Sequence, residues 1–84
     1  MDELHTRLDR AHGEIRAIRN KRAQRDLYLM LRPIERVLTQ MSSESVECRR
    51  LQRVTDRYQR LVAQCEELMD NLEKHLLMAR LMYG

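Results

Sequence analysis

Apolar residues recur at intervals of three or four along both halves of the chain, which is the period of an α-helix. In the first half they are Leu4, Leu8, Ala11, Ile15, Ile18, Ala23, Leu27, Met30, Ile34 and Val37. In the second half they are Leu51, Val54, Tyr58, Leu61, Cys65, Met69, Leu72, Leu76, Ala79 and Tyr83. Written in opposite directions, the two series match position for position, with residue numbers that add to 87 in the outer five pairs and to 88 in the inner five. This symmetry predicts two antiparallel helices that pack along one apolar seam.

The expected fold is therefore all-α, an antiparallel, coiled-coil-like two-helix hairpin that forms a single domain over residues 1–84. We expect the first helix over about residues 2–41, the turn over about 42–45 and the second helix over about 44–82. The segment Ser42-Ser43-Glu44-Ser45 supplies hydroxyl groups for capping, and Glu44 and Glu47 place negative charge at the positive end of a helix that starts there. The turn is accordingly placed near Ser43.

Three features disturb the helical pattern of the first half. Pro33 lacks a backbone N–H and clashes with the preceding turn, so it predicts a kink or a brief interruption within one continuous arm. Gly13 costs about 1 kcal/mol relative to alanine inside a helix. The apolar pattern also jumps five residues from Ile18 to Ala23, which we interpret as a phase shift shared by both helices at the same height.

Size and composition favour association with a partner. A chain of 84 residues without Trp or Phe has a small aliphatic core and buries only roughly 60% of the surface that its unfolded form exposes. A partner or a second copy would bury more apolar surface. The net charge of +3, from 16 basic and 13 acidic residues, is modest. Basic clusters at Arg16–Arg25 and Arg49–Arg60 are interspersed with acids and lack aromatic residues for base stacking, which disfavours nucleic-acid binding.

No group of residues indicates catalysis. The chain has no glycine-rich loop, no nucleophile elbow and no Cys-His pair with a supporting acid, so we expect neither an enzyme nor a cofactor. His5, Asp9 and His12 share one helical stripe, but a dedicated metal site normally needs a further ligand and supporting hydrogen bonds. We expect these three residues to be solvated and to bind no metal.

The cysteines and the start of the chain bear on the compartment. Cys48 and Cys65 are expected on the same helix, 17 residues and therefore roughly 25 Å apart, too far for a disulfide between them. The chain opens with acidic residues, and no apolar run approaches the length that a bilayer requires. These features indicate a soluble, cytoplasmic protein without a transmembrane segment.

Apolar residues that the seam does not use gather in the second helix. They are Val62, Leu68, Leu77, Met78, Leu81 and Met82. A helix that is apolar on more than one side is expected to be buried on more than one side, and contiguous apolar patches mark interaction sites. We therefore predict a partner-binding surface on the C-terminal half of the second helix. The occupant is either a different protein or a second copy that completes a four-helix bundle, and no small-molecule substrate is expected.

The pattern resembles a known family. The opening Met1-Asp2-Glu3-Leu4-His5-Thr6-Arg7-Leu8, a turn about halfway, Tyr58-Gln59 early in the second helix and the apolar end from Leu72 to Leu81 are similar to the small helical-hairpin co-chaperones of bacterial type III secretion. Pro33 and the arginine-rich start of the second helix depart from that family.

The resemblance spans most of the chain and implies a cytoplasmic, non-enzymatic protein. Such a protein binds a helical chaperone and helps to hold a needle or translocator subunit before export. The competing interpretation is a homo-oligomeric coiled-coil scaffold subunit, which would use the same sequence features.

Overall fold

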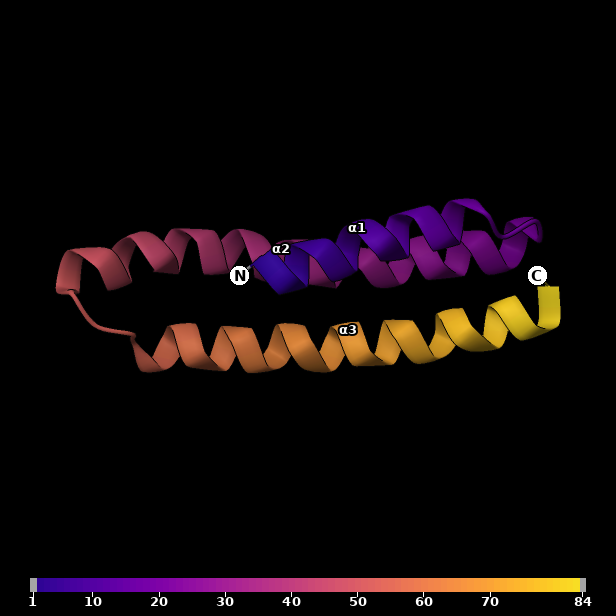
Figure 1. Ribbon diagram of the computed structural model, residues 1–84. Coiled ribbons are helices and arrows are strands. Elements are labelled where there is room, and N and C mark those ends of the chain that lie inside the picture. Colours follow the sequence, from indigo (N-terminus) through magenta and orange to yellow (C-terminus); the bar gives the residue numbers. More distant parts are fainter. Residues whose placement is uncertain (1, 84) are drawn as a thin grey trace.

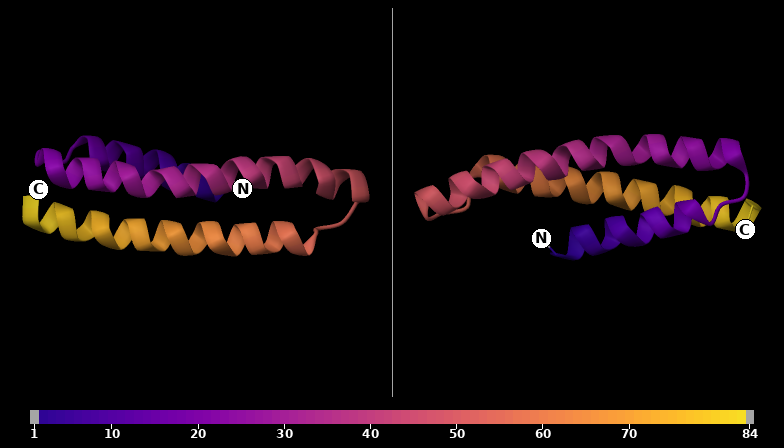
Figure 2. Two further views of the ribbon diagram at one scale, coloured as in Figure 1. Left: turned by 180° about the vertical axis from the view of Figure 1, so that it is seen from behind. Right: turned by 90° about the horizontal axis from the view of Figure 1, so that it is seen from above.

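The computed structural model describes residues 2–83, which form three α-helices and, within that range, no strand. Helix α1 spans Asp2–Arg16, α2 spans Lys21–Leu51 and α3 spans Asp56–Tyr83. The molecule measures 47 × 18 × 16 Å, so its length is about that of α2 alone. Figures 1 and 2 show α2 and α3 side by side along this length, with α1 folded back beside about half of it. The all-α prediction is confirmed, but the two-helix hairpin is replaced by a three-helix arrangement in which α2 and α3 pack most closely.

The predicted turn at residues 42–45 is wrong, because the serine-rich segment lies inside α2. Ser42 and Ser43 are exposed there, whereas Met41 beside them is buried against the core. Capping preference is a weak local signal, and burial of the apolar face of α2 outweighs it. The chain instead turns between Leu51 and Asp56.

The turn between α2 and α3 is fixed by side chains on both sides of it. Gln52 ends α2 in the left-handed conformation, with φ of 57°. The Thr55 hydroxyl accepts a hydrogen bond from the Tyr58 backbone N–H (3.1 Å), as an N-cap does, and donates one to a Glu44 carboxylate oxygen (2.8 Å). Glu44 also lies 3.6 Å from Arg57. Thr55 is buried, so its hydroxyl links the start of α3 to the side of α2.

A second break, absent from our sequence prediction, separates α1 from α2. Asn20 has an extended backbone and its side chain accepts a hydrogen bond from the Ala23 N–H (2.9 Å), which caps the start of α2. The Gln24 amide donates to the carbonyl oxygens of Ile15 (3.1 Å) and Arg16 (3.3 Å) at the end of α1, and the Ile15 oxygen also accepts from the Ile18 N–H (3.0 Å). These bonds close both ends of the connection.

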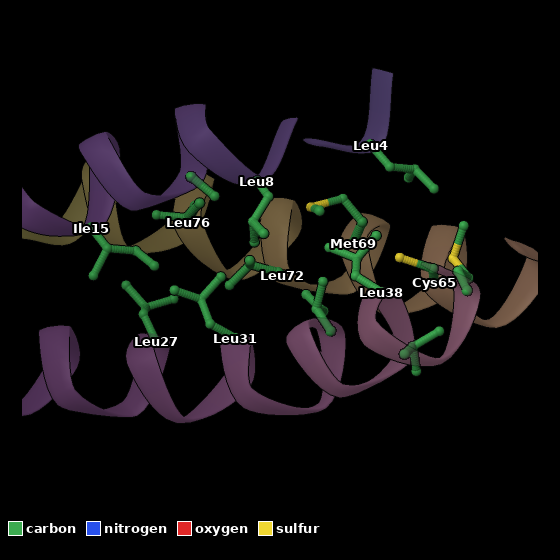
Figure 3. Packing of buried hydrophobic residues seen from close by; sticks show 14 of the residues in the cluster. Leu4, Leu8, Ile15, Leu27, Leu31, Leu38, Cys65, Met69, Leu72 and Leu76 are labelled. Atoms are coloured by element: carbon green, nitrogen blue, oxygen red, sulfur yellow. The ribbon is translucent and has the colours of Figure 1, made fainter. Parts of the chain in front are cut away.

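The five-residue jump in the apolar pattern therefore marks a chain reversal, and its interpretation as a phase shift between two long helices is wrong. Because α1 runs antiparallel to α2, it runs parallel to α3 (Figure 1). Arg7 accordingly contacts Asp70 and Glu73. Figure 3 shows Leu8 beside Leu72, so the antiparallel pairs predicted between residues 4–18 and 69–83 do not form.

Pro33 lies within α2, which continues through it without interruption. Proline leaves the carbonyl oxygen of Leu29, four residues earlier, without its usual helical partner. Leu29 is 49% exposed, so water can reach that turn of the helix. Of the two alternatives predicted at Pro33, the brief interruption does not occur, and the helix runs on through the proline.

The core is aliphatic and draws on all three helices (Figure 3). Its buried members are Leu4, Leu8, Ala11, Ile15, Ile18, Leu27, Leu31, Ile34, Val37, Leu38, Met41, Leu61, Cys65, Met69, Leu72, Leu76 and Ala79. Leu31 and Leu38 lay outside the predicted seam, yet they are buried because α2 packs against two helices. Leu51 and Val54 were placed in the seam, but they lie at the turn and are 38% and 58% exposed.

We expect Thr55→Val to destabilise the fold by about 1–2 kcal/mol, because it removes the cap of α3 and leaves Glu44 without its hydroxyl donor. Thr39→Val is the matched control, since the exposed Thr39 hydroxyl bonds only the Glu35 carbonyl of its own helix. Its effect should stay within about 0.5 kcal/mol. Urea unfolding followed by circular dichroism measures both variants, and equal losses would contradict the role assigned to Thr55.

Candidate protein-binding surface

The C-terminal end of α3 carries a cluster of exposed apolar side chains. Leu77 is 58% exposed, Met78 60%, Leu81 80% and Met82 68%. Burying one Leu or Met side chain contributes roughly 1.5–3 kcal/mol, so leaving four in water forfeits a large stabilisation for a chain of this size. We call these four residues the α3 terminal cluster.

The other two predicted binding residues, Val62 and Leu68, differ from this cluster in both burial and position. Both are partly buried and pack against the core. Val62 is also separated from Leu77 by 15 residues, or roughly 22 Å along α3. The six residues that we predicted as one surface therefore divide into an exposed cluster at the helix end and two side chains at the edge of the core.

A shallow groove between α1 and α3 borders the α3 terminal cluster. Its lining from α3 is Leu77, Arg80 and Leu81, and its lining from α1 is Arg10, Gly13 and Glu14; Ala17 and Ile18, just after the end of α1, complete it. A Cβ placed on Gly13 would meet no atom within 4 Å outside its own stretch of helix, so the α1 wall is low at that point. The sequence analysis missed this wall because it placed α1 antiparallel to α3. The available signal was the pair of small residues Gly13 and Ala17, one helical turn apart.

Positive charge surrounds this end of the bundle. Lys21, Arg22 and Arg25 gather at the start of α2, and Tyr83 at the end of α3 borders a region that Arg22 shares with one acid, Asp26. The first turn of α2 contains no acidic residue, so the partial positive charge of its N-terminus is not offset there. Within the groove, Arg80 lies 3.5 Å from Glu14. The site thus combines apolar side chains with a basic rim.

Arg7 holds α1 against α3 close to the groove. Its guanidinium donates two hydrogen bonds to Glu73, at 3.0 and 2.6 Å, and one to Asp70 at 2.7 Å. These bonds, to Glu73 above all and then to Asp70, raise the pKa of Arg7 above its ordinary value, so the side chain stays charged. Two acids of α3, Asp70 and Glu73, are thereby engaged within the molecule.

The histidines and cysteines considered in the sequence analysis form no common site among residues 2–83. His5 and Asp9 are exposed and His12 is half-buried, and no group of three or more His, Cys, Asp or Glu residues in the described part of the chain is arranged to hold a metal. Cys48 and Cys65 are free and lie on different helices, which corrects their predicted placement on one helix. Burial raises the pKa of the Cys65 thiol, so it stays protonated and unreactive.

Comparison with known proteins finds no matching family model, no matching curated protein and no matching solved structure. Over residues 2–83, none of the helices combines the length and apolarity needed to cross a membrane. The geometry of the α3 terminal cluster and its groove is therefore the basis for any functional conclusion.

We expect Arg7→Gln to destabilise the fold by about 1 kcal/mol, because it breaks two partly exposed ion pairs between α1 and α3. Arg10→Gln, one turn along the same helix, removes a charge that forms none of the ion pairs seen among residues 2–83, and should change stability by less than about 0.5 kcal/mol. Thermal unfolding of the two variants makes the comparison. A loss of stability in Arg10→Gln as large as that in Arg7→Gln would contradict the role assigned to Arg7.

Proposed function

We propose that this protein is a non-enzymatic binding module that docks onto another protein through the end of α3. The observation that carries this proposal is the α3 terminal cluster, four exposed Leu and Met side chains on one helix end. Exposed apolar side chains that lie together mark interaction sites, and Met adapts its shape to the partner surface. The three helices present this cluster outside a core that is buried among them.

In its more specific form, we propose a co-chaperone that helps a helical chaperone to hold a type III secretion needle or translocator subunit. This form is supported by the sequence resemblance alone. A partner that covers exposed apolar surface also stabilises the folded state by mass action, which suits a small helical protein. A homo-oligomeric scaffold subunit is the second candidate, and its support is the same exposed cluster.

The test compares Leu81→Asp with Arg53→Asp in a pull-down and in light scattering. We expect the wild-type chain to be a monomer that captures a protein partner, and Leu81→Asp to lose that partner while retaining its helicity. Arg53→Asp changes an exposed residue in the opposite turn and should leave binding intact. A stable dimer that Leu81→Asp dissociates would support the scaffold instead.

If Leu81→Asp still captures the partner and Arg53→Asp does not, the binding surface lies at the opposite end of the molecule and the proposal is wrong. Circular dichroism of each variant, recorded beside the pull-down, separates lost binding from lost folding.

A further inference from the structure

We propose that the groove between α1 and α3 accepts an amphipathic helix that carries acidic residues beside its apolar face. This inference rests on the proposed function and specifies the chemistry of the partner. The groove is apolar at its centre and basic around it, and each of these properties restricts what can bind.

The shape of the groove suits a helix. Leu77 and Leu81 are four residues apart on α3. On the other wall, Gly13 of α1 is followed four residues later by Ala17, whose N–H donates to the Gly13 carbonyl oxygen (3.3 Å), so each wall repeats once per helical turn. Because α1 and α3 run parallel, the two repeats follow the same direction. Open space above Gly13 allows a helix to approach the α1 backbone closely. Apolar side chains at intervals of three and four on a partner helix can pack between these walls.

The charges favour an acidic partner. Arg10 and Arg80 line the groove, and the cluster of Lys21, Arg22 and Arg25 lies at the same end of the bundle. The acidic residue in the lining, Glu14, already faces Arg80 at 3.5 Å. Complementary charge on the partner would accelerate encounter and fix its orientation.

A second copy of the chain is a poor occupant. Two copies related by a twofold axis at this end would bring both basic rims together, where like charges repel. Each helix also has its own apolar face buried in the core, and Asp70 and Glu73 are held by Arg7. In a second copy, the acids nearest its exposed apolar side chains, Asp70 and Glu73 on α3 and Glu14 on α1, are therefore already paired with arginines.

An anionic membrane surface would also attract a basic and apolar helix end. A flat surface, however, would contact the exposed Leu81 and Met82 without entering the hollow between α1 and α3. The hollow between two helices therefore favours a helix as the occupant.

The experiment uses two designed helical probe peptides with identical leucine spacing, one flanked by Glu and the other by Lys, titrated into the full chain by fluorescence anisotropy. We expect the Glu peptide to bind at least tenfold more tightly than the Lys peptide and to weaken as salt is raised. Gly13→Leu should reduce its affinity at least tenfold by filling the groove, and it should fold, since leucine favours helix over glycine and the Cβ has free space.

Arg80→Gln should weaken the Glu peptide several-fold, whereas Arg53→Gln, at the opposite turn, should leave it unchanged. Equal affinity for the two peptides, or full affinity in Gly13→Leu, would overturn the proposal. The proposal would also be overturned if the chain sedimented with phosphatidylglycerol vesicles and Gly13→Leu did not reduce this binding.

Capture of the natural partner by three variants distinguishes a failure of this inference from a failure of the proposed function. If Leu81→Asp abolishes capture of that partner but Gly13→Leu and Arg80→Gln do not, the binding module stands and the acidic-helix groove falls. If capture survives Leu81→Asp, the proposed function itself fails.

Discussion

Burial of the aliphatic seam between α2 and α3 is the interaction on which the rest of the molecule depends. These two helices pack more closely with each other than either does with α1. Their apolar faces meet along almost the whole rod, and the Thr55 hydroxyl joins them at the turn. Helix α1 then adds Leu4, Leu8, Ala11 and Ile15 along one flank, where it completes the core for about half of the length. The groove lies along this flank, between α1 and α3.

The helical period, and with it the all-α class, could be predicted from the spacing of apolar residues, but the topology could not. A stripe of apolar positions is compatible with any chain reversal that keeps its period, and the match between the two halves favoured a reversal at Ser43. The actual reversals depend on specific hydrogen bonds, those of Asn20 and Gln24 at one end and of Thr55 at the other. Ser, Asn and Thr all favour caps, so composition alone did not distinguish Ser43 from Asn20. The jump after Ile18 was the signal of the true break.

The candidate site could be predicted only in part, because the topology was not known from the sequence. Leu77, Met78, Leu81 and Met82 were identified as surplus to one seam, and they are exposed. Leu31 and Leu38 were surplus to that seam too, yet they are buried, because α2 packs against two neighbours. Which surplus residues are covered depends on the position of α1. The basic and apolar groove likewise required the parallel placement of α1 and α3, which brings residues 10–18 beside residues 77–81.

The direction of α1 is the central claim, and a distance between two spin labels tests it most directly. In a background without the native cysteines, labels replace the exposed Glu3 and Met82. With α1 parallel to α3 and Arg7 level with Asp70 and Glu73, Glu3 lies about 20 Å along the axis from Met82. Double electron–electron resonance should therefore give a long, single-peaked distance for this pair and a short one for Glu3 with Glu66. A short distance between Glu3 and Met82, with a long one to Glu66, would restore the two-helix hairpin and remove the groove.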